Sequence, residues 1–314
     1  MSLVPQLAIV APCYNEEAAL KESLEKLIIK IKELIAKGMV KDSSYLLVVD
    51  DGSKDASFSI LQTAVGKHIK VLKLAGNVGH QRALLAGMHW VTDKCDVMIS
   101  MDIDLQDDPG TIDRMLEEYA KGNQIVYGVR DNRDADSWFK KNSALMFYQL
   151  METMGVGLIY NHADFRLLSN NVLREFSRYR EVNLFLRGIF PMMGYPNTKV
   201  FYQRQERTAG ESKYPLRKML HLAMDGITSF SNRPLKWISM IGLIIFIISL
   251  ILSVWVLWVV VTGRSVPGWA SITLPIYFIG GIQLLSLGII GEYVSKIYLE
   301  SKSRPQYHIE KVLE

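Results

Sequence analysis

Two long stretches near the carboxyl end carry no charged residue, and they restrict the fold more than any other feature of this 314-residue chain. Trp237–Thr262 reads WISMIGLIIFIISLILSVWVLWVVVT, and a second uncharged stretch covers Ser265–Gly291. About 20 apolar residues in a row are enough to cross the hydrocarbon core of a bilayer as a helix. We therefore predict a membrane hairpin over residues 236–292, with spans at about 237–262 and 270–291. The alternative is a pair of helices buried in a large soluble core.

Basic residues around the two stretches indicate an orientation. Outside the hairpin they are Arg233, Lys236, Lys296, Lys302 and Arg304. Only Arg264 lies in the connection between the stretches. Because basic residues collect on the cytoplasmic side of a membrane, we expect a multi-pass protein of the plasma (inner) membrane. Both termini and the part of the chain before the hairpin should then be cytoplasmic. The two cysteines form no CxxC pair, which fits a reducing compartment.

The segment just before the hairpin, residues 213–235, has apolar residues at helical spacing with basic residues between them. This pattern predicts an amphipathic helix in the membrane interface, or equally one packed on the soluble part of the protein. The domain boundaries that follow are a soluble domain over 1–212, this interfacial region over 213–235, the hairpin, and a cytoplasmic tail over 293–314.

Short apolar runs alternate with amphipathic segments over residues 6–130. The runs predict strands at 7–11, 45–49, 69–74, 97–100 and 124–128, and the segments between them predict helices at 16–36, 56–65, 80–92 and from Pro109 to about 121. Strands that alternate with helices form βαβ units, in which a parallel sheet is covered on both faces. The predicted fold class is therefore α/β with a mostly parallel sheet, followed by two transmembrane α-helices.

Polar turns follow the first four expected strands. They are Tyr14-Asn-Glu16, Asp50-Asp-Gly-Ser53, Gly76-Asn-Val-Gly-His80 and Asp102-Ile-Asp104. In open α/β sheets, ligands bind beyond the carboxyl ends of the strands, so these turns predict one binding crevice. For the second turn alone, the alternative is a strand-to-helix connection with Ser53 as the helix cap.

The predicted crevice is rich in carboxylates. Asp102 and Asp104 stand at i and i+2 directly after the apolar run Val97–Ser100. Like charges this close repel each other, and they repel phosphate, unless a cation lies between them. Mg²⁺ and Mn²⁺ bind through one or two carboxylates together with phosphate oxygens and water. The pattern therefore favours a divalent metal site for a phosphorylated ligand over an exposed acidic loop.

Other phosphate-binding classes are disfavoured by what the sequence lacks. It contains no Walker A lysine loop and no GxGxxG run, the signatures of P-loop and Rossmann sites. The net charge of +4 is too small to imply a nucleic acid partner.

Taken in order, the four turns resemble the motifs of family 2 glycosyltransferases with a GT-A fold. The matching runs are Pro12-x-Tyr14-Asn15-Glu16-Glu17, Val49-Asp-Asp-Gly-Ser53 with Asp55, Gly76-Asn77-x-Gly79, and Asp102-x-Asp104-Leu105-Gln106-Asp107. The resemblance continues through Asp164–Leu168 and Arg207–Tyr214 to the paired apolar stretches, so it covers nearly the whole chain. Within the family, the chain is similar to polyisoprenyl-phosphate glycosyltransferases, both the bactoprenol (undecaprenyl-phosphate) glucosyltransferases and dolichol-phosphate mannose synthase.

The resemblance implies a role for each matching residue. The implied nucleotide-sugar contacts are Pro12, Tyr14, Glu16, Asp50, Asp51, Gly79, Asp102, Gln106 and Lys213. Asp102 and Asp104 would also hold Mg²⁺ or Mn²⁺ against the diphosphate. The implied catalytic residues are Asp164, Asp104 and Arg207. For Asp164, a buried structural ion pair with Arg166 is the alternative.

A run of basic residues after the fifth expected strand is the candidate site for an acceptor phosphate. Its members are Arg130, Arg133, Lys140 and Lys141. The alternative is a solvated basic face. His80 and His162 lie near the motifs but lack a partner at ligand spacing, so we interpret neither as a metal ligand.

The activity that the resemblance implies is inverting transfer of a sugar from a nucleotide donor to polyprenyl phosphate at the cytoplasmic membrane face. UDP-glucose and undecaprenyl phosphate are the first choice of substrates, and the product would serve the modification of a cell-envelope glycan. Alternatives are mannose transfer from GDP-mannose and a non-catalytic membrane scaffold of a glycan export system. A processive polysaccharide synthase is disfavoured, because the chain has no Gln-x-x-Arg-Trp run. The relatives also imply a homo-oligomer, with a tetramer as one form, and a separate flippase.

Overall fold

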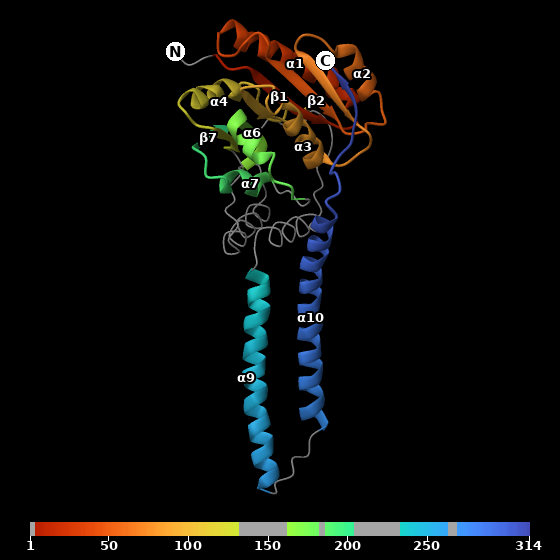
Figure 1. The fold of residues 1–314 in the computed structure, drawn as a ribbon, viewed down its shortest axis with the longest axis vertical. Helices are drawn as coiled ribbons and strands as arrows, with labels where there is room; N and C mark the ends of the chain where they lie inside the picture. Colours follow the sequence, from red (N-terminus) through yellow and green to blue (C-terminus); the bar gives the residue numbers. More distant parts are fainter. Residues whose placement is uncertain (1–3, 132–161, 182–185, 204–232, 263–268) are drawn as a thin grey trace. The chain divides into compact units, whose positions relative to one another are not determined.

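The computed structural model describes residues 4–131, 162–181, 186–203, 233–262 and 269–314. The chain divides into two compact units. The described residues of the sheet unit lie within Met1–Gln149, Gly157–Tyr214 and Ser303–Glu314, and those of the helical unit lie within Pro215–Lys302. Figure 1 colours the chain from its amino end in red to its carboxyl end in blue.

The sheet unit is built on an eight-stranded sheet with the order β7-β5-β6-β4-β1-β2-β3-β8. The strands are β1 (Leu7–Cys13), β2 (Tyr45–Asp50), β3 (Ile69–Leu74), β4 (Val97–Ser100), β5 (Ile125–Arg130), β6 (His162–Ser169), β7 (Asn197–Tyr202) and β8 (Ile309–Leu313). β4, β1, β2 and β3 are parallel neighbours, and so are β5 and β7. β6 runs antiparallel between β4 and β5. The predicted α/β class with a mostly parallel sheet is confirmed.

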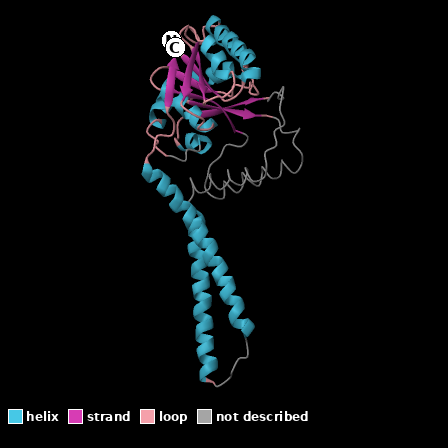
Figure 2. Cartoon of the chain, turned by 90° about the vertical axis from the view of Figure 1, so that its right-hand side faces the viewer, coloured by secondary structure: helices cyan, strands magenta, loops and turns pink. Residues whose placement is uncertain are grey.

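Helices cover both faces of this sheet, as Figure 2 shows. They are α1 (Glu17–Ala36), α2 (Ser57–Ala64), α3 (His80–Val91), α4 (Thr111–Ala120), α6 (Asn170–Phe176) and α7 (Leu186–Met192). On one face, α1 packs beside α2, and Lys37, directly after α1, forms an ion pair with Asp113 of α4 (2.9 Å). On the other face, Phe176 of α6 contacts both His89 of α3 and Phe190 of α7.

The buried strands β1 and β2 require close packing of α3. Every residue of both strands is buried, as expected for strands covered on two faces. On the α3 side, a Cβ added to Gly87 would collide with the side chains of Val10 and Val49. On the opposite side, alternate residues such as Leu7 and Ile9 belong to the main apolar core. This close packing fixes the position of α3, and the first residues of α3 border the site described below.

The last strand, β8, returns the chain to the sheet after the helical unit. It pairs antiparallel with β3, from Val71 opposite Leu313 to Leu74 opposite Ile309. Just before this strand, Tyr307 Oη lies 2.8 Å from His89 Nδ1. The carboxyl end of the chain is therefore part of the sheet unit.

The described part of the helical unit consists of α9 (Arg233–Val261) and α10 (Trp269–Lys302), which lie side by side in Figures 1 and 2. Among the described residues, one helical segment, Phe278–Lys302, is long and apolar enough to cross a membrane, and Pro234–Ile245 is a shorter apolar helix. The second span is therefore not confirmed, and the two-span hairpin stays a prediction. The predicted interfacial helix and the connection at 263–268 lie outside the described residues, apart from 233–235.

Candidate active site

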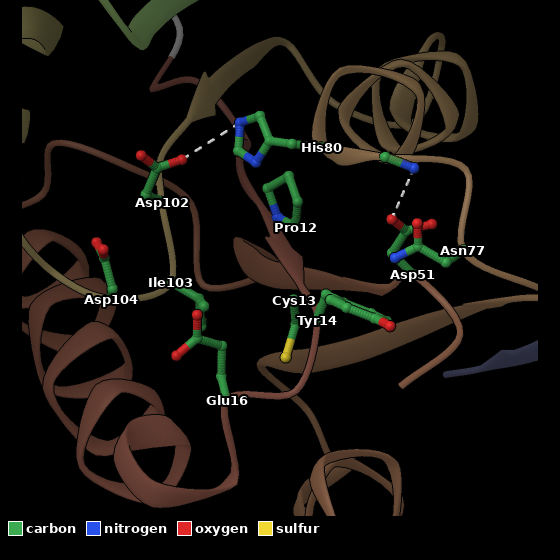
Figure 3. Close-up of a pocket in the computed structure, with 11 residues that line it drawn as sticks. Pro12, Cys13, Tyr14, Glu16, Asp51, Asn77, His80, Asp102, Ile103 and Asp104 are labelled. Carbon is green, nitrogen blue, oxygen red and sulfur yellow. Dashed lines mark hydrogen bonds and ion pairs between the residues drawn. The ribbon is translucent and has the colours of Figure 1, made fainter. Parts of the chain in front are cut away.

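A cavity of about 440 Å³ opens at the carboxyl ends of β1, β2, β3 and β4. Its lining residues are Pro12, Cys13, Tyr14, Glu16, Asp51, Asn77, Gly79, His80, Asp102, Ile103 and Asp104 (Figure 3). All four predicted polar turns contribute to this lining. The volume is in the range of small-molecule sites, and the position is where open α/β sheets bind their ligands.

The carboxylate of Asp51 holds the turn after β3. It accepts hydrogen bonds from the backbone N–H groups of Val78 (2.8 Å) and Gly79 (2.9 Å). Beside it, Gly52 has a φ of +68°, and a Cβ there would lie 2.7 Å from the carbonyl carbon of Gly76. Only glycine fits between these two turns without strain. Asp51 therefore lines the cavity and also fixes the start of α3.

The turns after β1 and β2 are tied together by serine hydroxyl groups. The N–H of Asn15 donates to Ser53 Oγ (3.1 Å), and the N–H of Glu16 donates to Ser57 Oγ (2.9 Å). Asn15 has a φ of +54°, a conformation that Asn tolerates better than most residues. These contacts hold Tyr14 and Glu16 at the cavity wall.

Asp102 forms the acidic edge of the cavity. Its side chain is 37% exposed, and its Oδ1 lies 3.4 Å from His80 Nε2. Among the described residues, this is its only ion pair. Loss of solvent raises the pKa of Asp102 to about 6, the charges of Asp107 and Asp164 add to this rise, and His80 opposes it. The site therefore holds a carboxylate whose negative charge is poorly compensated.

The other acidic residues of the turns differ in their access to the cavity. Asp104 lines it and accepts a hydrogen bond from the N–H of Gln106 (3.2 Å). The side chains of Gln106 and Asp50 are buried, and neither lines the cavity. Burial raises the pKa of Asp50. Both were expected to contact the nucleotide sugar, and these contacts stay predictions.

Asp107 is buried beside two side chains from the far strands. Tyr202 donates from its hydroxyl group to Asp107 Oδ1, and Arg130 Nη2 lies 3.5 Å from the same oxygen. Arg130 Nε also donates to Tyr202 Oη (3.3 Å). The parallel ladder of β5 and β7 pairs Arg130 with Tyr202, which explains why both reach one carboxylate. Arg130, a predicted acceptor residue, is therefore held by Asp107 and Tyr202.

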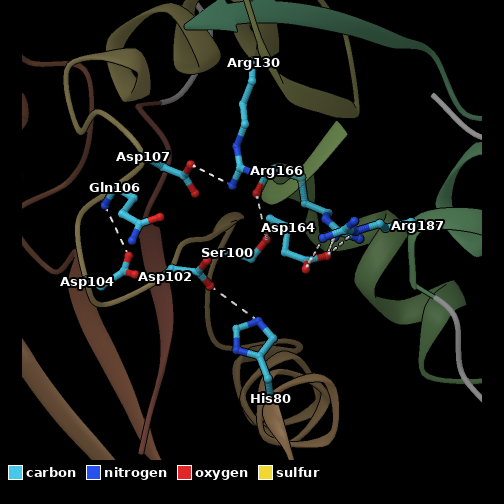
Figure 4. Close-up of polar contacts among 10 residues, drawn as sticks. All are labelled: His80, Ser100, Asp102, Asp104, Gln106, Asp107, Arg130, Asp164, Arg166 and Arg187. Atoms are coloured by element: carbon cyan, nitrogen blue, oxygen red, sulfur yellow. Dashed lines mark hydrogen bonds and ion pairs between the residues drawn. The ribbon is translucent and has the colours of Figure 1, made fainter. Parts of the chain in front are cut away.

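Asp164 lies between two arginines (Figure 4). Arg166 Nη2 donates to Asp164 Oδ1. Arg187 of α7 donates from Nη2 to Oδ2 (3.0 Å) and from Nε to Oδ1 (3.4 Å). Burial alone would raise the pKa of Asp164, but the two arginines hold it well below its usual range. Arg166 is fully buried, and its Nε and Nη1 have no hydrogen-bond partner among the described residues.

The antiparallel pairing of β4 with β6 brings Asp102 and Asp164 together. The ladder pairs Ser100 with Arg166. Continued by two residues, this register puts Asp102 opposite Asp164 on the same face of the sheet, because side chains alternate along a strand. Ser100 Oγ also donates to the carbonyl oxygen of Asp164 (2.5 Å). Figure 4 shows the two carboxylates close together, with different neighbours.

Several predicted site residues lie outside the described part of the chain: Arg133, Lys140, Lys141, Arg207 and Lys213. Their roles stay predictions. Two side chains that sequence reasoning missed are Arg187 and Tyr202, which stand outside every motif. Tyr202 reaches the site through the pairing of β7 with β5, and Arg187 reaches it from α7. The contact of Arg166 with Asp164 could be predicted from the sequence, since residues at i and i+2 on a strand share a face.

Comparisons with known proteins agree with the motifs. The model of Glycosyl transferase family 2 matches residues 8–177. The uncharacterized glycosyltransferase YkoT of Bacillus subtilis (strain 168) is 46% identical over 98% of this chain and 91% of its own. Bactoprenol glucosyl transferase of Shigella phage SfX is 37% identical over 97% of this chain and 98% of its own. The structure of glucosyl-3-phosphoglycerate synthase from Mycobacterium tuberculosis is a more distant likeness, with 17% identity and a TM-score of 0.47 over 71% of this chain and 78% of that one.

Proposed function

Since the chain belongs to glycosyl transferase family 2 and is a glycosyltransferase, we propose that it transfers glucose from UDP-glucose to polyprenyl phosphate at the cytoplasmic membrane face. A phosphate oxygen of the lipid forms a bond to the anomeric carbon, and the bond from that carbon to UDP breaks. Attack from the face opposite the leaving group inverts the anomeric centre, so an α-linked donor gives a β-linked lipid phosphosugar. Undecaprenyl phosphate is the proposed acceptor, and modification of a cell-envelope glycan is the proposed use of the product.

The observation that carries this proposal is the acidic edge of the cavity. Asp102 and Asp104 both line it, and the charge of Asp102 is poorly compensated. Two carboxylates fit Mg²⁺ or Mn²⁺, which complete their coordination with phosphate oxygens and water. No group of three metal-binding side chains occurs among the described residues, so donor phosphate oxygens and water would have to supply the remaining ligands of such a metal. When bound, such a metal neutralises charge on the leaving UDP.

The wall of the cavity away from Asp102 and Asp104 is suited to bind a nucleotide. Tyr14 offers an exposed ring at its edge, and Glu16 offers carboxylate oxygens to hydroxyl groups. Asp51 lines the same wall, with both carboxylate oxygens held by backbone N–H groups. Pro12 and Gly79 complete this wall, which we propose as the binding surface for base and ribose. Glucose as the sugar, and a bactoprenol-type lipid as its acceptor, are supported by the name of the Shigella phage relative.

The acceptor phosphate needs little chemical activation. A phosphate monoester has a second pKa near 6 and carries close to two negative charges at pH 7. Its oxygen can therefore attack without a strong base. The task left to the protein is to hold this anion beside the donor. Arg130 is the described candidate, and the remaining basic candidates, including Arg207 and Lys213, lie outside the described residues.

The order of the two units along the chain supports a membrane hairpin. β8 follows α10 in sequence but pairs with β3, so the sheet unit contains chain from both sides of the helical unit. If the helical unit crosses a membrane, it crosses an even number of times, because one sheet cannot lie on both sides. We propose two spans at about 237–262 and 270–291, both termini in the cytoplasm, and the domain boundaries predicted from the sequence. A homo-oligomer and a separate flippase remain predictions.

A transfer assay tests the proposed function. Membranes that contain the protein are given radiolabelled UDP-glucose, undecaprenyl phosphate and Mn²⁺, and we expect labelled lipid that EDTA abolishes and Mn²⁺ restores. A parallel reaction with GDP-mannose tests the mannose alternative, and chain length of the product tests a processive synthase. If no donor labels the lipid and calorimetry detects no nucleotide-sugar binding, the proposal is wrong and a scaffold is the better description.

A further inference from the structure

We propose that Arg187 binds the phosphate of the acceptor, and that Asp164 is the positioning residue that holds the Arg187 guanidinium in place. This inference rests on the proposed function, because it assigns part of the acceptor site within that reaction. The contacts of Asp164, rather than a sequence motif, lead to Arg187.

Both carboxylate oxygens of Asp164 accept hydrogen bonds from arginine side chains. Arg166 contacts Oδ1, and Arg187 contacts Oδ1 and Oδ2. A carboxylate held by two arginines binds a proton weakly, so it is poorly suited to act as a general base. The acceptor phosphate is already ionised and needs no such base. The contacts of Asp164 therefore serve a different purpose, which is to orient a guanidinium group.

The two arginines differ in what they can reach. The side chain of Arg166 is fully buried, whereas that of Arg187 is 38% exposed. Arg166 stands two residues after Asp164 on β6 and anchors the acid from within the sheet. Arg187 comes from α7 and contacts the same acid (Figure 4). A buried arginine can only fix the carboxylate, but a partly exposed one can also bind a ligand.

The strand order puts Arg187 on the acceptor side of the site. The cavity proposed for the donor is lined by turns after β1, β2, β3 and β4, whereas Asp164 lies on β6, on the other side of β4. A donor held at Asp102 thus has the nucleotide on one side and Arg187 on the other. In a displacement with inversion, the attacking oxygen approaches opposite the leaving group. A phosphate that attacks the sugar therefore approaches from the side where Arg187 lies.

A second arginine on this side is held in the same way. Arg130 at the end of β5 is fixed by Asp107 and Tyr202, as Arg187 is fixed by Asp164. Arg130 and Arg187 are close enough for their charges to oppose each other. A phosphate that carries nearly two negative charges would relieve that repulsion and accept charge-assisted hydrogen bonds from both. Because both guanidinium groups are already oriented by their carboxylate partners, less conformational entropy is lost when the lipid phosphate binds.

Steady-state kinetics of two substitutions test Arg187 directly. In detergent, polyprenyl phosphate and UDP-glucose are varied separately for Arg187→Gln and Arg187→Lys. Arg187→Gln should raise the KM for the lipid about 10- to 100-fold, as expected for a lost charge-assisted bond, and leave the KM for UDP-glucose nearly unchanged. Arg187→Lys keeps the charge without the planar fork and should lie between wild type and Arg187→Gln. The matched control is Arg178→Gln, which removes the same charge from an exposed ion pair with Glu175 (2.8 Å).

A third substitution, Asp164→Asn, separates positioning from base catalysis. If Asp164 positions Arg187, the lipid KM should rise about as much as in Arg187→Gln, the double variant should be no worse, and the pH profile of kcat should keep its shape. If Asp164 is the base, kcat should fall, the acidic limb of the profile should disappear, and the lipid KM should not change. Should Asp164→Asn fail to fold, Arg187→Gln still decides the question, because it leaves Asp164 and Arg166 in place.

Two results would overturn the inference. One is an unchanged lipid KM in Arg187→Gln. The other is a rise confined to the KM for UDP-glucose, which would put Arg187 at the donor diphosphate. Failure of the proposed function would look different, because the wild-type protein would then transfer no sugar to polyprenyl phosphate at any concentration. Calorimetry of UDP-glucose with Mn²⁺ tests the donor site by itself.

Discussion

Asp102, two residues after β4, and Asp164 on the neighbouring β6 have reversed electrostatic surroundings. Asp102 faces a cavity and a histidine, and its pKa rises to about 6. Asp164 faces two arginines, which hold its pKa well below the usual range. The difference teaches that one residue type has two tasks here. In the proposed function Asp102 recruits a cation from outside, whereas Asp164 already contacts two arginines.

The largest effect that would sharpen this contrast is the loss of activity in Asp102→Asn. We expect transfer to fall by about 10³-fold or more, because the leaving diphosphate loses its charge compensation. Rates of lipid labelling at saturating substrates, with Mn²⁺ varied, measure it. Asp108→Asn is the matched control, because Asp108 belongs to the same acidic run but accepts a bond from the N–H of Gly110 (2.9 Å). An Asp102→Asn variant with nearly wild-type, EDTA-sensitive activity would contradict the assignment.

The next effect concerns stability and should appear at Asp164 rather than at Asp102. Arg166→Met leaves the buried acid Asp164 with one arginine, and breaking a buried ion pair costs about 3–5 kcal/mol of unfolding free energy. Asp102→Asn removes a poorly compensated charge and should leave the stability equal or higher. Thermal unfolding of both variants in the same detergent compares them. Equal midpoints for Arg166→Met and wild type would show that Asp164 does not depend on its arginines.

A smaller effect is the pH dependence of metal binding. A cation needs the ionised carboxylate, so protons compete with it, and affinity should rise with pH through about 6 and level off above it. With a pKa of about 6, the affinity for Mn²⁺ in the presence of UDP-glucose should fall about fourfold from pH 7.5 to pH 5.5. Calorimetry at several pH values measures this. Asp164 has a lowered pKa and should not titrate in this window. Because its charge helps to raise the pKa of Asp102, Asp164→Asn should keep a single titration but shift it to lower pH.

The smallest effect tests whether contact with an arginine is enough. Arg174 contacts Asp93 as Arg166 contacts Asp164, but both Arg174 and Asp93 are exposed. Solvent screens such a pair, so Arg174→Gln should change neither the unfolding midpoint nor the transfer rate measurably. A loss of stability as large as that of Arg166→Met would mean that burial does not distinguish the two pairs.

Local patterns were enough to predict the first half of the sheet and failed for its later strands. β1 to β5 are apolar runs between turns, and the predicted ranges match them closely. β6 carries Asp164 and Arg166 on one face, so the ion pair interrupts the continuous apolar run by which β1 to β5 were predicted. β8 pairs with a strand more than 230 positions earlier, as the contact of Lys73 with Glu310 shows. A local sequence pattern cannot predict that β8 pairs with β3.

The candidate site also has a part that local patterns predict and a part that they do not. Motifs at strand ends were sufficient to predict the cavity, because parallel strands bring their carboxyl ends to one edge. Asp50 and Asp51 are adjacent in sequence but differ in outcome: Asp50 is buried beneath the lining and Asp51 is part of it. The sequence alone does not say which neighbour faces the cavity. Arg187 could not be predicted, because its link to Asp164 depends on where α7 packs.

The most direct test of the central claim is to locate manganese in a structure determined with UDP-glucose and Mn²⁺. The anomalous signal of the ion marks its position independently of the protein chain. We predict a single peak within bonding distance of the carboxylates of Asp102 and Asp104, next to the diphosphate, and no peak at Asp164. A diphosphate bound without an ion at those two side chains, or manganese at Asp164, would contradict the account.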